Sequence, residues 1–85
     1  MLLRRESNMK DYSVSELNRG IDEWIVGRNA ERNRLILKWK LIDGLSYMEI
    51  MKRLNTDEYP ESYHLLVRQI QRVIRKSEDI LFRHI

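Results

Sequence analysis

Cysteine is absent from this chain of 85 residues, so neither a disulfide nor a zinc–thiolate site can stabilise it. The chain also has only three glycines and one proline, and it is rich in residues that form helices readily. It contains no run near the roughly 18 apolar residues of a membrane span. Residues 1–5 place their charges after the apolar residues, unlike a signal peptide. These absences predict a small, cytoplasmic, all-α protein with no membrane segment.

The charged residues are sorted by segment, although the net charge is only +3. Residues 64–77 contain four cations and no acid, namely Arg68, Arg72, Arg75 and Lys76. Residues 57–61 contain three acids and no base, namely Asp57, Glu58 and Glu61. A solvated helix face is the alternative explanation of the basic segment. We nevertheless expect this basic segment to bind a negatively charged partner.

Two serines mark the starts of predicted helices. Ser13 and Ser46 are each followed three residues later by a glutamate, Glu16 and Glu49, which is the spacing of a capping box. Gly44 can take the left-handed conformation that ends the preceding helix. The sequence therefore predicts a helix end, a tight turn and a new helix within residues 43–54.

Four helices are predicted in all. The first three cover residues 14–27, 29–43 and 47–54, with Asn29 capping the second. The last helix has an apolar stripe at helical spacing, formed by Tyr63, Leu66, Val67, Ile70, Val73, Ile74, Ser77, Ile80 and Leu81. Pro60 could be its first residue, because proline tolerates that position. We expect a small bundle of four helices over 13–85, preceded by a flexible N-terminal arm over 1–12.

The family resemblance rests on residues 28–37, which lead into 41–47, and on the later segments 67–70 and 81–85. Together these resemble small proteins of phages and mobile elements in Gram-positive bacteria. Those proteins look like the fourth region of bacterial sigma factors, the helix-turn-helix that binds the promoter −35 element. The resemblance implies a helix-turn-helix here, with a recognition helix at about 66–77.

The turn of this helix-turn-helix is enlarged relative to the family pattern. About nine extra residues lie within residues 55–65, and they include three acids and the only proline. An insertion at this place could change the orientation of the last helix or sterically hinder its contact with DNA. It makes the manner of docking an open question at the level of sequence.

The first interpretation is a DNA-binding transcription regulator of phage or mobile-element origin, with double-stranded DNA as its partner. Arginine pairs with guanine and glutamine with adenine in the major groove. The residues expected to read bases are Arg68, Gln69, Gln71 and Arg72. Those expected to contact phosphate are Ser46, Tyr47, Arg75 and Lys76. The cations Arg32, Arg34, Lys38 and Lys40 add positive charge at positions that the sequence does not relate to a groove.

The alternative is a small protein-interaction module that binds and inhibits or redirects a host protein, such as RNA polymerase or a nuclease. The insertion is acidic and rich in tyrosine, which suits a protein surface better than a phosphate backbone. The residues expected at such a contact are Asp57, Glu58, Tyr59, Glu61 and Tyr63.

No catalytic or metal-binding residues are predicted, and no cofactor is expected. His64 and His84 lie far apart in the sequence, and several converging ligands would be needed for a metal. Tryptophans and methionines at helical spacing are expected in the core, namely Trp24, Trp39, Met48 and Met51. The apolar tail, Ile80, Leu81, Phe82 and Ile85, could pack on the first helix or form the seam of a homodimer, and we favour the first.

Overall fold

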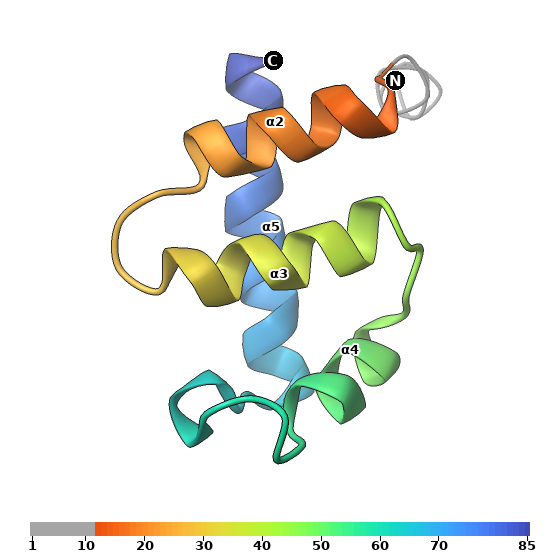
Figure 1. Cartoon of the computed structure of the whole chain (residues 1–85), viewed down its shortest axis with the longest axis vertical. Helices are drawn as coiled ribbons and strands as arrows, with labels where there is room; N and C mark the ends of the chain where they lie inside the picture. The colour runs from red at the N-terminus through yellow and green to blue at the C-terminus, as the bar shows by residue number, and fades with distance from the viewer. Residues whose placement is uncertain (1–11) are drawn as a thin grey trace.

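The computed structural model describes residues 12–85, which form an all-α domain (Figure 1). Its four α-helices are α2 (Val14–Trp24), α3 (Ala30–Leu41), α4 (Tyr47–Leu54) and α5 (Val67–His84). A short 3₁₀ helix, η1 (Glu61–Tyr63), lies between α4 and α5. This part of the chain contains no β-strand. The predicted fold class, a small bundle of four helices, is confirmed.

Helix α5 is the longest element, and α2, α3 and α4 all pack against it. Figure 1 shows α2 and α3 crossing α5, with α4 near the end of the molecule where α5 begins. The fully buried side chains come from all four helices: Ile21, Ile36, Leu37, Ile50, Leu54, Ile70, Ile74 and Leu81. A single core therefore joins the four helices, and it leaves the opposite face of α5 exposed.

Both predicted capping boxes are present. The Ser46 hydroxyl accepts from the Glu49 N–H at 3.1 Å, and the Ser46 N–H donates to the Glu49 carboxylate at 2.8 Å. Ser13 and Glu16 repeat this arrangement at the start of α2. Hydrogen bonding of the Glu49 carboxylate to Ser46, above all to the Ser46 backbone N–H, lowers the pKa of Glu49. Glu49 therefore stabilises the fold above its unfolded-state pKa, and this contribution is lost as the pH falls through the folded-state value.

We expect Ser46→Ala to lower the free energy of unfolding by about 0.5–2 kcal/mol, because the Glu49 N–H loses its acceptor. Thermal or denaturant unfolding measures this loss. Ser62→Ala is a matched control, since Ser62 is also exposed but lies in η1. Equal stability of the Ser46→Ala variant and the wild type would contradict a capping role.

The other two helix starts differ from the predictions. Asn29 is the N-cap residue of α3, but its backbone is left-handed (φ 62°) and its side chain makes no capping hydrogen bond. The last helix begins at Val67, so the possible start at Pro60 is not the one that the structure shows. Pro60 instead precedes η1, and Leu66 lies outside the helix with 68% of its surface exposed. The Leu66 N–H donates to the Gln69 side-chain oxygen at 2.8 Å, which closes the first turn of α5.

The apolar tail packs on the N-terminal part of the domain, as the sequence favours. The ring of Phe82 stacks on that of Tyr12, with centroids 5.9 Å apart, and the Tyr12 hydroxyl donates to the Ile85 carbonyl at 2.9 Å. A Cβ atom at Gly20 would lie 3.0 Å from the side chains of both Leu81 and Ile85. Tyr12 is thus docked on the domain, although the sequence predicts it within the arm. The rest of the arm, residues 1–11, lies outside the described residues.

Three apolar residues expected on buried stripes are exposed instead. They are Leu66, Met48 and Ile80, with exposed fractions of 68%, 50% and 39%. Of the two tryptophans, Trp39 is buried, whereas Trp24 is partly exposed and stacks on the His84 ring with centroids 4.1 Å apart. Helical spacing alone therefore overestimates the width of the buried faces.

Candidate nucleic-acid interface

The exposed face of α5 carries most of the residues that the sequence predicts at a DNA contact. Ile70 and Ile74 are buried beneath it and anchor the helix. The side chains on the outer face are all exposed: Arg68, Gln71, Arg72, Arg75 and Lys76. The four cations among them span about 100° of the helix circumference and about 12 Å along its axis. We call these four residues the basic ridge.

Gln69 lies at the edge of this face and is partly engaged. Its side-chain oxygen accepts the hydrogen bond that closes the first turn of α5. Only its amide group is left to donate to a partner. Gln71 has no such engagement, so it is the freer of the two predicted glutamines.

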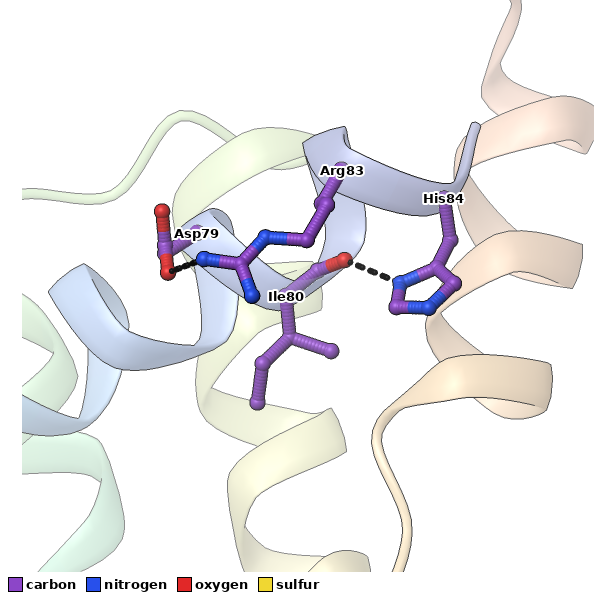
Figure 2. A network of polar contacts seen from close by, with 4 residues as sticks. All are labelled: Asp79, Ile80, Arg83 and His84. Carbon is purple, nitrogen blue, oxygen red and sulfur yellow. Dashed lines mark hydrogen bonds and ion pairs between the residues drawn. The ribbon is translucent and has the colours of Figure 1, made fainter.

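The C-terminal end of α5 holds its polar side chains in local contacts (Figure 2). Arg83 pairs with Asp79 at 2.7 Å, which neutralises its charge. The Nδ1 atom of His84 lies 2.9 Å from the Ile80 carbonyl and donates to it, since a carbonyl can only accept. The four cations of the basic ridge lie in the first ten residues of α5, within 67–76, and the Arg83–Asp79 pair lies beyond them.

A cleft of about 490 Å³ lies beside the basic ridge, between the start of α3 and the side of α5. The polar side chains that line it are Arg28, Asn29, Arg32, Asn33, Gln69, Arg72, Lys76 and Ser77. The apolar side chains that line it are Ile25, Val26, Leu65, Val73 and Ile80. Two residues of the basic ridge, Arg72 and Lys76, therefore also belong to the cleft.

The cleft is lined by four cations and no carboxylate in the part of the chain that the structure describes. Arg32 is partly buried, and this burial lowers the pKa of its guanidinium by removing water from the charge. Its Nε donates to the neutral Asn33 side chain at 3.0 Å and not to an acid. Positive charge therefore lines the cleft on both sides, from Arg28 and Arg32 at the start of α3 and from Arg72 and Lys76 on α5.

The other cations of α3 are engaged within the protein. Lys38 pairs with Asp22 at 2.9 Å, and the Nε of Arg34 donates to the Ile25 carbonyl at 2.7 Å. Lys40 lies 4.5 Å from the centre of the Tyr47 ring. Of the α3 cations noted in the sequence, only Arg32 faces the cleft.

Ser46 and Tyr47, predicted to bind phosphate, do not line the cleft. Ser46 is occupied by its capping box, and the Tyr47 ring lies under Lys40. The structure therefore gives both residues a structural role at the start of α4, apart from the cationic cleft beside α5.

The insertion, residues 55–65, is a closed loop. The Asn55 side chain donates to the Leu65 carbonyl at 2.9 Å and accepts from the Leu65 N–H at 3.0 Å. The two ends of the insertion thus lie together, directly after α4 and directly before α5. The added residues form a loop whose two ends are hydrogen-bonded to each other. They therefore do not increase the distance between the end of α4 and the start of α5.

The two tyrosines of the insertion, which the sequence places at a possible protein contact, are partly buried and pack against the core. Tyr59 meets the buried Trp39 ring edge-on at 5.7 Å. The Tyr63 hydroxyl donates to the Glu31 carboxylate at 3.2 Å. The three acids Asp57, Glu58 and Glu61 remain exposed, so only they are free to meet a partner.

We expect Asn55→Ala to lower the free energy of unfolding by about 1–2 kcal/mol, because two hydrogen bonds across the loop are lost. Limited proteolysis should then cut within 56–64 before it cuts the helices. Asn55→Asp keeps the acceptor for the Leu65 N–H. Its free energy of unfolding should therefore lie between those of Asn55→Ala and the wild type. Unchanged stability and unchanged cleavage would show that the loop is held closed by its aromatic packing alone.

The two histidines are engaged in local contacts. The Nε2 atom of His64 lies 3.1 Å from the Thr56 carbonyl and 3.3 Å from the Tyr59 carbonyl, inside the insertion. No group of three or more His, Cys, Asp or Glu side chains that could hold a metal ion occurs within residues 12–85. No helix among these residues is long and apolar enough to cross a membrane.

Comparisons of the chain with models of protein families, with curated proteins and with solved structures found no match.

Proposed function

We propose that this protein binds double-stranded DNA through α5, with α4 and α5 forming a helix-turn-helix. The observation that carries this proposal is the basic ridge, four exposed cations with no acid on the exposed face of the first ten residues of α5. A recognition helix needs an apolar back that anchors it and a polar front that enters the major groove. Ile70 and Ile74 provide the first, and the basic ridge with Gln71 provides the second.

The closure of the insertion supports the helix-turn-helix interpretation. A helix-turn-helix requires a short connection between its two helices. Asn55 follows α4 directly, and its side chain holds Leu65, two residues before α5. The enlarged turn is therefore compatible with a helix-turn-helix, because the first and last residues of the insertion lie next to each other.

The position along α5 suggests which residues read bases. Contacts to base edges come mainly from the N-terminal part of a recognition helix. Arg68, Gln71 and Arg72 lie in its first two turns, whereas Arg75 and Lys76 follow one turn later. We propose that the first three contact bases and that the last two contact phosphate. The role in transcription regulation and the phage or mobile-element origin rest on the family resemblance.

A salt series on purified protein and double-stranded DNA tests the proposal. Phosphate binding releases counterions, so affinity must fall steeply as the salt concentration rises. A pull-down from host extract with and without nuclease provides the second measurement. Loss of the captured material on nuclease treatment supports DNA binding, whereas a protein partner that survives nuclease contradicts it.

The exposed acids of the insertion favour one second candidate, a protein-interaction module that captures a host protein. Asp57, Glu58 and Glu61 are displayed on a loop whose ends are clamped and whose tyrosines pack on the domain. A rigid acidic loop loses little conformational entropy when it binds a basic partner. DNA would instead be repelled by these carboxylates.

Changing Asp57, Glu58 and Glu61 together to serine separates the two candidates. If α5 binds DNA, removing three negative charges near its start should raise DNA affinity, most strongly at low salt. If the insertion holds a protein, the same variant should lose that partner from the pull-down. Its thermal stability should stay close to that of the wild type, because the three side chains are exposed. If the variant shows the DNA affinity of the wild type and also keeps its protein partner, neither candidate role of the acidic residues is correct.

A further inference from the structure

We infer that the cleft between the start of α3 and α5 is a second DNA-contacting site, which holds backbone phosphates of the same DNA that α5 reads. This inference rests on the proposed function and adds two residues to it, Arg28 and Arg32. Neither residue belongs to the recognition helix, and both lie in the cleft with Arg72 and Lys76.

The charge of the cleft fits phosphate. Four cations line it, and no carboxylate among the described residues lines it with them. Arg32 is the most informative, because its charge is partly removed from water without an acid to pair with. A phosphate oxygen would restore the lost interactions, and a guanidinium can bind two phosphate oxygens at once.

The neutral part of the cleft fits the sugar that separates one phosphate from the next. Val26 and Ile80 lie at the cleft and are exposed, with 64% and 39% of their surfaces accessible. Apolar side chains at these positions can pack on deoxyribose without reading a base. The cleft would therefore accept any sequence.

The cleft continues onto the basic ridge, so one DNA strand could occupy both surfaces. Arg72 and Lys76 belong to both surfaces, one helical turn apart on α5. A strand bound to the ridge thus passes directly into the cleft. Contacts to phosphate set the register and orientation of a protein on DNA. Arg28 and Arg32 would hold α5 at a fixed angle to the groove.

The experiment uses Arg28→Ala, Arg32→Ala and the double variant in the full chain, with Arg19→Ala as a matched control. Arg19 is an exposed arginine on α2 and does not line the cleft. The affinity for double-stranded DNA of mixed sequence is measured between 50 and 200 mM salt, and thermal melting verifies that each variant is folded.

Each single variant should weaken binding to all DNA sequences alike and should reduce the slope of log affinity against log salt by about 0.9. For the double variant the slope should fall by about 1.8, so its deficit relative to the wild type should shrink about tenfold between the two salt concentrations. Arg32→Lys keeps the charge and should retain the wild-type slope. Arg19→Ala should bind like the wild type.

Two results would overturn the inference. If the double variant binds with the affinity and slope of the wild type, whereas Arg72→Ala binds more weakly, the cleft does not hold DNA and the proposed role of α5 stands. If the wild type binds no DNA at all, the inference fails together with the proposed function. A third arm titrates adenosine triphosphate alone: saturable micromolar binding that Arg32→Ala removes, without any effect on DNA affinity, would make the cleft a nucleotide site instead.

Discussion

Replacing Arg68 and Arg72 together by alanine is expected to remove the preference of this protein for its own DNA site. Each arginine that pairs with a guanine contributes about 1–3 kcal/mol of specific binding. Both side chains lie on the first two turns of α5, where base contacts are expected, and both are exposed. Binding to the selected site should therefore fall by one to several orders of magnitude, towards the affinity for unrelated DNA. Site selection from a random pool, followed by titration, measures this.

Two single variants serve as controls for this double substitution. Arg75→Ala should weaken binding to every sequence alike, because a phosphate contact carries no sequence information. Arg83→Ala should have little effect, because that arginine is paired with Asp79 near the other end of α5 (Figure 2). An undiminished site preference in the Arg68/Arg72 double variant would contradict major-groove reading by α5.

Replacing Ile70 by alanine is expected to lower the free energy of unfolding by about 2–5 kcal/mol. Ile70 is fully buried beneath the basic ridge, at the start of α5. Small domains have total stabilities of about 5–15 kcal/mol, so this loss would remove a large part of the stability of the domain. Urea unfolding followed by circular dichroism gives the free energy directly.

Ile80→Ala is the matched control for Ile70→Ala. Both substitutions remove the same atoms from the same helix, but 39% of the Ile80 surface is exposed and Ile80 lies at the cleft. Its loss should cost less than about 1 kcal/mol, because it leaves no closed cavity. Equal destabilisation by the two substitutions would show that the α5 core does not lie where the structure places it.

The elements that local chemistry determines were predictable. Ser13 and Ser46 are followed by glutamates at the spacing of a capping box, and both boxes form as expected. The start of α5 was not predictable in the same way. Its first turn is closed by Gln69 behind Leu66, and the segment before it is held by the Asn55 side chain, ten residues away from Leu65. The helical spacing of apolar residues therefore includes Tyr63 and Leu66, which lie before the helix begins at Val67.

The cleft could not be predicted from the sequence, because it is made by two helices that tertiary packing brings together. Arg28 and Arg32 precede Arg72 by about forty residues, and nothing local relates them. The α3 cations also look alike in the sequence. Only the structure distinguishes Lys38, which is paired with Asp22, from Arg32, which faces the cleft without an acid.

The exposure of the charged residues of the insertion could be expected from the sequence, but the packing of its tyrosines could not. Its three acids are exposed, as expected for a polar loop. Tyr59 packs on the buried Trp39, which is distant in the sequence. A tyrosine in an acidic loop looks the same in the sequence whether it faces solvent or the core, so this difference depends on the fold.

The most direct measurement of the central claim is a map of the amide chemical shifts of the protein as double-stranded DNA is added. The largest changes should fall on residues 68–76 of α5, with a second group at Arg28 and Arg32. Residues 57–61 of the insertion should change little. Changes confined to the insertion, or no changes at saturating DNA and low salt, would contradict the proposal that α5 is the DNA-binding surface.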